Sequence, residues 1–140
     1  MFISKNNPFR WASILQLFIA TGTCIYFSAQ ENIQLPNVSS VDKILHLIAF
    51  FIYGLSLQFF FIALFQKNKT NNKKYAILTI IVGFTFALSD EIHQYFVPGR
   101  RADIIDLLVD WLGICLSLLC IKIVNTIYIY FCSKTEKIPT

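Results

Sequence analysis

The sequence predicts an all-α protein, a four-helix bundle that spans a membrane. Hydrophobic residues make up 56% of the 140 residues and charged residues only 14%, and the mean hydropathy is +0.59. A chain of this length, expected to form one domain over residues 1–140, would need a more polar surface to be stable in water. The apolar residues also form four long runs with the charges gathered between them. Lipid is therefore the expected solvent for much of the surface.

Four apolar runs can reach the length of about 20 residues that a transmembrane helix needs. The first run has no charge and is longer than the apolar stretch of about 7–15 residues in a signal peptide, so it is expected to be an uncleaved anchor. The third run is long enough only if the helix continues through "SDEIHQYF" to Phe96. The expected spans are 11–29, 44–65, 75–96 and 104–131.

The positions of the basic residues predict the orientation of these spans. The segment "QKNKTNNKK", residues 66–74, carries four lysines and no acid, and basic residues also lie in both terminal stretches. Short loops rich in lysine and arginine stay on the cytoplasmic side. Both termini are therefore expected in the cytoplasm, and the connections that follow the first and third spans are expected outside.

Composition also argues against several classes of function. The basic residues form no continuous stripe, so no nucleic-acid partner is expected. The four cysteines have neither metal-ligand nor redox spacing, and each lies in or beside an apolar run, where a thiol packs as a small hydrophobe. No metal and no cofactor are expected.

The passage "LSDEIHQYFVPGRRADIIDLLVDW", residues 88–111, holds five of the eight acidic residues of the chain. Pro98 and Gly99 are expected to end the third helix, and Asp103 is expected to cap the fourth. Asp103, Asp106 and Asp110 have i, i+3, i+7 spacing and so project from one face. The passage therefore predicts a tight turn between two helices with carboxylates on an inward face.

Polar residues also mark one face of the third span and one of the second. Glu91, Gln94 and Tyr95 share a face by their i+3 and i+4 spacing, whereas Asp90 and His93 are expected to point elsewhere.

On the second span Asp42 and His46 are four residues apart, and Tyr53 follows on roughly the same face. Ionised groups inside a bilayer are costly and usually functional. His46 and Glu91 are therefore expected to face a common cavity.

Two blocks in this region, "DKILHLIAFFIYG" and "SDEIHQYFVPGRRADIIDLLVDWLG", resemble the VanZ-like family of small bacterial membrane proteins. The resemblance covers about residues 41–116. Its matching residues are Asp42 and Lys43, His46, Glu91 and Gln94, Pro98 to Arg100, Asp106, and Asp110 with Gly113.

The family is named for an accessory protein of teicoplanin resistance. The resemblance implies a multi-pass protein of the bacterial cytoplasmic membrane with an extracytoplasmic polar site, but it does not imply one reaction. This chain departs from the pattern at Asp110, where asparagine is common, and at Ser117, where a second glycine often stands.

The preferred functional hypothesis is a binding site for a charged amphiphile, such as a membrane lipid, a lipid-linked cell-envelope molecule or a glycopeptide. Arginine grips phosphate or carboxylate with two parallel hydrogen bonds, which suits the pair at positions 100 and 101. The expected ligand-binding residues are Gln94, Arg100, Arg101, Asp106, Asp110 and Tyr53.

The alternative is a membrane-embedded enzyme that acts on a lipid-linked headgroup. In this hypothesis Asp42 orients the imidazole of His46 and Glu91 is a general base, so these three are the candidate catalytic residues. Two further hypotheses are a divalent cation held by His46, Glu91, Asp106 and Asp110, which no metal-binding spacing supports, and a polar cluster that only locks the bundle. The sequence does not predict an oligomeric state.

Overall fold

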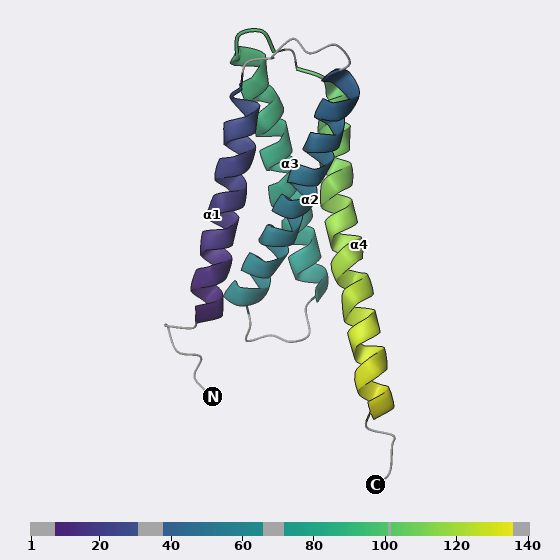
Figure 1. Ribbon diagram of the computed structural model, residues 1–140. Helices are drawn as coiled ribbons and strands as arrows, with labels where there is room; N and C mark the ends of the chain where they lie inside the picture. The colour runs from purple at the N-terminus through teal and green to yellow at the C-terminus, as the bar shows by residue number, and fades with distance from the viewer. Residues whose placement is uncertain (1–7, 31–37, 66–71, 101, 136–140) are drawn as a thin grey trace.

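The computed structural model describes residues 8–30, 38–65, 72–100 and 102–135. These ranges contain four helices and no strand: α1 (Pro8–Ser28), α2 (Val38–Leu64), α3 (Asn72–Phe96) and α4 (Ile104–Thr135). The helices run alternately in opposite directions (Figure 1). The ends of α1 and α3 therefore lie beside the starts of α2 and α4. We call this end of the bundle, which holds residues 42–46, 90–94, 100 and 102–110, the polar end.

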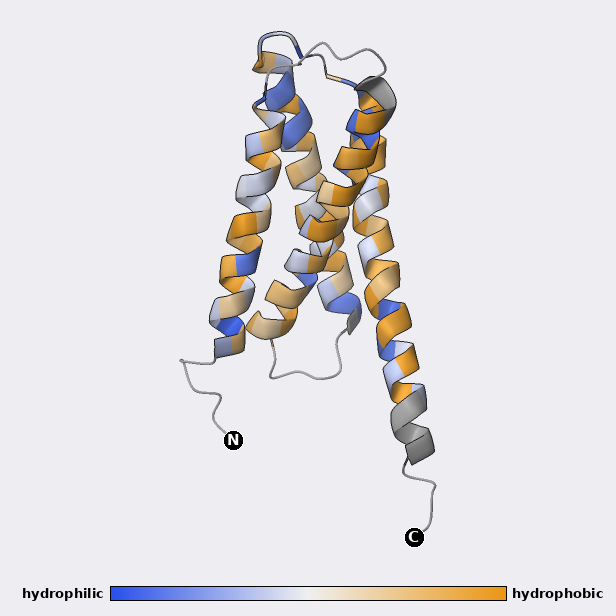
Figure 2. Ribbon diagram, in the orientation of Figure 1, coloured by the Kyte–Doolittle hydropathy of each residue, from blue (hydrophilic) through white to orange (hydrophobic). Residues whose placement is uncertain are grey.

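The outer surface of the bundle is suited to lipid. All four helices are long and apolar enough to cross a membrane. Large apolar side chains point away from the core, as Phe18, Ile81 and Leu119 do with exposed fractions of 79%, 57% and 51%. Figure 2 shows helices that are mostly orange along their length, with blue residues near the end of α3 and the start of α2. The predicted all-α transmembrane fold is confirmed, because exposed apolar surface of this extent is stable in hydrocarbon and not in water.

The helices extend beyond the apolar runs that predicted them. α2 starts at Val38, before residue 44, and α4 continues to Thr135, past residue 131. Hydropathy marks only the segment that suits the hydrocarbon core, whereas a helix continues while its backbone hydrogen bonds can form. The start of α2 therefore carries Asp42 and Lys43 on regular helix at the polar end.

α2 and α4 form the central contact of the bundle. A Cβ atom at Gly113 would lie 2.7 Å from the Leu47 carbonyl oxygen and 2.9 Å from the Phe51 nitrogen, so the two backbones approach closely there. Small residues permit such a crossing in membranes. One turn further along α4, Ser117 lies against Gly54. The close crossing fixes the rotation of α2 against α4, and with it the direction of their polar residues.

Ser117 makes a polar link inside this crossing. Its hydroxyl donates to the Ile114 carbonyl oxygen at 2.7 Å and accepts from Gln58 Nε2 at 3.1 Å. Its side chain is fully buried. The serine therefore fills the place of a small residue and satisfies a buried amide at the same time.

Aromatic rings fill the core next to this crossing. Tyr53 packs on Phe86 with ring centroids 4.5 Å apart and on Phe50 at 6.1 Å. Tyr53 is buried among these rings and does not line the cavities described below. Its expected role in ligand binding stays a prediction without a contact that supports it.

α1 lies at the edge of the bundle. It packs mainly on α2 and touches α3 only slightly. Its buried residues are small, namely Ser13, Ala20, Cys24 and Ser28. Most of the remaining α1 side chains are exposed, so this helix covers one side of α2 without completing a closed core.

Candidate functional site

The polar end buries an unusual number of ionisable side chains. Burial of a charge without partners is costly, so such groups must find one another or a ligand. They come from three helices: α2 supplies His46, α3 supplies Asp90 and Glu91, and α4 supplies Asp106 and Asp110, each at most 9% exposed. The neutral amide of Gln94 on α3 is buried with them. Buried polar residues from α2, α3 and α4 therefore converge at the polar end.

His46 pairs with Asp110. The distance from His46 Nδ1 to Asp110 Oδ1 is 2.9 Å, and Asp110 is fully buried. The second oxygen, Asp110 Oδ2, is buried without a hydrogen-bond partner. The carboxylate that orients the imidazole therefore comes from α4.

Asp42 was expected to orient His46, and this expectation is wrong. Asp42 Oδ1 instead lies 3.5 Å from Arg100 Nη2. Arg100 is mostly buried, and its Nε has no hydrogen-bond partner. One guanidinium donor is therefore left for another acceptor, while Arg101 lies outside the described residues.

On α3, Asp90 points into the cluster, contrary to the expectation that it points elsewhere. Its Oδ2 accepts a hydrogen bond from Gln94 Nε2 at 2.9 Å, and it is 6% exposed. Tyr95 was expected to share the inward face but is 69% exposed. The buried face is therefore rotated from the predicted one toward Asp90, with Glu91 at its edge.

The α3–α4 turn is formed by a glycine in a left-handed conformation and held by two hydrogen bonds. Gly99 has a φ of +81°, a conformation that suits glycine, and the Arg100 amide donates to the Val97 carbonyl oxygen at 3.1 Å. The Asp103 amide donates to Glu91 Oε1. Glu91 thus ties the end of α3 to the start of α4, although its Oε2 is buried without a partner.

Asp103 caps α4, as its position predicted. Its Oδ1 accepts from the Ile105 amide at 2.9 Å, and Lys43 Nζ lies 3.2 Å from its Oδ2. The amide, first, and the lysine hold the pKa of Asp103 below its ordinary value of 3.8. Lys43 also lies 3.0 Å from Asp106 Oδ1, so it neutralises charge on both carboxylates and joins α2 to α4.

A cavity of about 290 Å³ opens beside these groups between α1 and α2. We call its four ionisable lining residues, Asp42, His46, Asp90 and Arg100, the polar wall, and its apolar wall includes Phe27, Leu45 and Ile48. Glu91 is not part of either wall. The prediction that His46 and Glu91 face one cavity is therefore wrong: His46 lines the cavity, and Glu91 is buried but does not line it.

A second cavity of about 440 Å³ continues along α1 and α2 toward the opposite end. Thr23, Cys24, Ala49 and Ile52 line both cavities. The second cavity reaches Ala12 and Leu15 near the start of α1, and its lining is almost wholly apolar. We call the two together the α1–α2 groove.

A comparison with protein families identifies the chain. The model of the VanZ/LLP1 family matches residues 3–125. The chain belongs to the VanZ/LLP1 family. Comparison with curated proteins and with solved structures finds no match.

The residues that match the VanZ/LLP1 motif come from different helices and contact one another at the polar end. Lys43 meets Asp106, His46 meets Asp110 and Arg100 meets Asp42. Gly113 supplies the close approach to α2. The motif therefore describes one structure at the polar end: a helix crossing and the ion pairs that it aligns.

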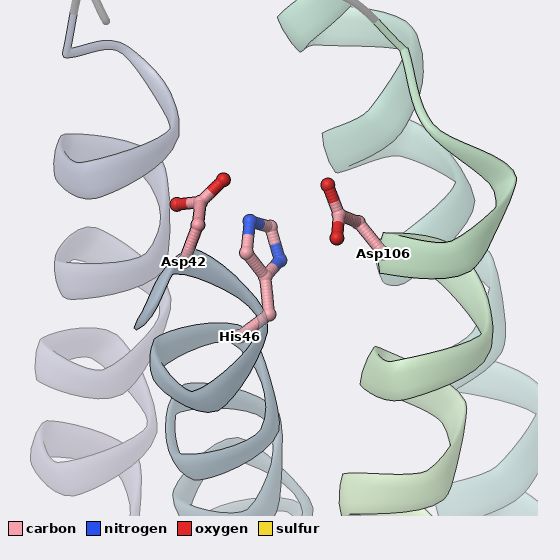
Figure 3. Close-up of side chains that lie close together, drawn as sticks. All are labelled: Asp42, His46 and Asp106. Atoms are coloured by element: carbon pink, nitrogen blue, oxygen red, sulfur yellow. The ribbon is translucent and has the colours of Figure 1, made fainter. Parts of the chain in front are cut away.

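Within the described parts of this VanZ/LLP1 protein, two groups of side chains lie close enough together to hold a metal ion. The first is Asp42, His46 and Asp106, and Figure 3 shows the imidazole between the two carboxylates. The second is His46, Asp90 and Asp110, all buried. In each group the potential ligand atoms lie within 4.8 Å of one another.

Asp90 is the residue of this set that sequence reasoning missed. The signal was present in the small residues Thr79, Gly83 and Ala87, which are buried along α3 at steps of four. Small residues mark the contact face of a membrane helix, and one further step of three leads to Asp90.

Proposed function

We propose that the protein binds a membrane amphiphile, with the polar head at Asp42, His46, Asp90 and Arg100 and one apolar chain in the α1–α2 groove. The observation that carries this proposal is the continuity of the groove from the polar wall to Ala12 and Leu15. Such a shape fits a molecule that is polar at one end and apolar along its length. Ligand sites are typically apolar clefts with a few convergent polar groups.

The charges of the polar wall suggest the chemistry of the head. The unpartnered Nε of Arg100 suits a phosphate or carboxylate oxygen, the acceptors that arginine prefers. Asp42 and Asp90 accept hydrogen bonds, so they suit hydroxyl or ammonium groups. A phosphate that carries a sugar or an amine combines both, which favours a phospholipid or a lipid-linked cell-envelope intermediate. An effect on susceptibility to glycopeptides such as teicoplanin would follow from binding of such a molecule.

We place the polar end on the outer side of the bacterial cytoplasmic membrane. Lysines cluster in residues 66–74, at the opposite end from the acidic connections. Short basic loops remain in the cytoplasm. On this arrangement the head would be taken from the outer leaflet.

Cysteine labelling tests the orientation. In a background without the four native cysteines, Asn37→Cys should react with a membrane-impermeant maleimide in intact cells, and Asn72→Cys should react only after the cells are lysed. Gel-shift analysis of the labelled protein measures both. The reverse pattern would move the polar end to the cytoplasmic side.

Blocking the α1–α2 groove should remove the amphiphile. Ala49→Phe places a ring where the two cavities join, so the fraction of protein with bound lipid should fall about tenfold or more, which corresponds to about 1.4 kcal/mol. Arg100→Lys keeps the charge but loses the planar fork, and it should lose a charge-assisted hydrogen bond of roughly 1.5–3 kcal/mol. Native mass spectrometry of protein extracted with its own lipids measures both variants.

Leu119→Phe is the matched control, because Leu119 is 51% exposed on α4 and lines neither cavity. It should retain lipid as the parent does. Equal lipid retention in Ala49→Phe and the parent would overturn the proposal that the groove is the binding site.

Catalysis on the same head is the second candidate. The observation that favours it is that a buried carboxylate holds His46 Nδ1 at 2.9 Å on the cavity wall, since such a contact fixes an imidazole for proton transfer. The extracted lipids would then include a modified head that is absent when His46→Gln replaces the parent. An unchanged set of lipids would restrict the role to binding.

A further inference from the structure

We infer that His46, Asp90 and Asp110 hold one divalent transition-metal ion. The ligands come from α2, α3 and α4, which is why no motif of neighbouring residues predicted a metal. The inference does not depend on the proposed amphiphile, because it concerns the protein's own side chains.

The first argument is distance. The potential ligand atoms of the three residues lie within 4.8 Å of one another, and His46 Nδ1 lies 2.9 Å from Asp110 Oδ1. Metal bonds of about 2.0–2.2 Å place adjacent ligands roughly 3 Å apart. An ion can therefore take the place of the proton between His46 and Asp110 while Asp90 closes the third side.

The second argument is an unsatisfied atom. Asp110 is fully buried, and its Oδ2 has no hydrogen-bond partner. A buried carboxylate oxygen without a partner is costly. Asp90 has a neutral partner for one oxygen, since Gln94 donates to its Oδ2, and its Oδ1 is left for the ion.

The third argument is charge. Among the described residues, no lysine or arginine lies within ion-pair distance of Asp90 or Asp110. The other candidate group, which consists of Asp42, His46 and Asp106, has such countercharges. Arg100 pairs with Asp42 and Lys43 with Asp106. A protonated His46 balances only one of the two carboxylates at the group of His46, Asp90 and Asp110, whereas a divalent cation bound to the neutral imidazole balances both.

The ligand chemistry indicates the class of metal. Imidazole suits zinc and other first-row transition ions, whereas calcium and magnesium prefer oxygen ligands alone. Three protein ligands also leave a position open, as in catalytic metal sites. Because His46 and Asp90 line the cavity, the open position would be accessible from it.

The test uses the full chain in detergent micelles, stripped with a chelator and titrated with Zn²⁺ and Mn²⁺. Calorimetry should show one ion per chain. Asp90→Asn should weaken binding by more than about 100-fold, because loss of a ligand costs more than loss of an outer-shell partner, which costs about 10–100-fold. Nitrogen coupling from His46 in the electron paramagnetic resonance spectrum of bound Mn²⁺ would support the same site without any substitution.

Two controls make the result specific. His93→Gln removes the other histidine, which is exposed and whose Nδ1 lies 3.3 Å from Ser28 Oγ, and this variant should bind the ion as the parent does. Asp106→Asn should also leave the affinity within about threefold, well below the 10–100-fold cost of losing an outer-shell partner. Absence of Zn²⁺ and Mn²⁺ binding, or loss with Asp106→Asn but not with Asp90→Asn, would overturn the inference.

Discussion

Replacement of His46 by alanine should destabilise the protein by about 3–5 kcal/mol, the usual cost of breaking a buried charged pair. The variant leaves Asp110 fully buried with neither oxygen satisfied, since Oδ1 loses the imidazole at 2.9 Å and Oδ2 has no partner already. The free energy of unfolding, measured in micelles with a chelator present, gives the effect of the pair alone.

A double-mutant cycle isolates this interaction. His46→Ala combined with Asp110→Leu should be more stable than His46→Ala, because the second change removes the unpaired carboxylate. His93→Ala is the matched control, and its effect should stay within about 0.5 kcal/mol because the side chain is exposed. A small effect of His46→Ala, comparable to that of the control, would mean that the pair does not hold the polar end together.

Gly113→Leu should destabilise the protein by about 3 kcal/mol, at the upper end of the range for overpacking. The first added carbon would already lie 2.7 Å from the Leu47 carbonyl oxygen, and a backbone atom cannot rotate away. The separation of α2 from α4 would also pull His46 from Asp110 and Lys43 from Asp106. The midpoint temperature of thermal unfolding and the fraction of protein that retains lipid should therefore both fall.

Gly22→Leu provides the comparison, because a Cβ at Gly22 meets no atom within 4 Å. The same chemical change on the lipid-facing side of α1 should leave thermal unfolding nearly unchanged or raise its midpoint, since glycine disfavours helix. Equal behaviour of the two variants would show that the α2–α4 crossing tolerates separation.

The fold could be predicted from the sequence because lipid imposes a simple rule. A segment that crosses hydrocarbon must be long, apolar and helical, and four runs satisfied this rule. The first and last residues of each helix were harder to predict. The start of α2, for example, carries Asp42 and Lys43, so hydropathy does not mark it as part of the helix. The location of both termini in the cytoplasm was inferred from the lysines between residues 66 and 74, and it stays a prediction.

The site was predictable in its residues but not in their pairing. Position along each span placed His46, Glu91 and Asp110 at one depth, because depth follows from sequence alone. The partner of His46 depended on the rotation of α2 against α4, which Gly113 and Ser117 fix through packing. A spacing of i, i+4 favoured Asp42 as that partner, but Arg100 from the following turn binds Asp42 instead.

The position of α1 at the edge of the bundle has a kinetic consequence. Because α1 rests mainly on α2 through small side chains, the groove between them lies at the side of the bundle and not in its closed core. A bilayer lipid would then reach the groove by lateral diffusion, without leaving its leaflet. Its occupancy would follow its mole fraction in the membrane, and a water-soluble analogue of its head would compete poorly at any ordinary concentration.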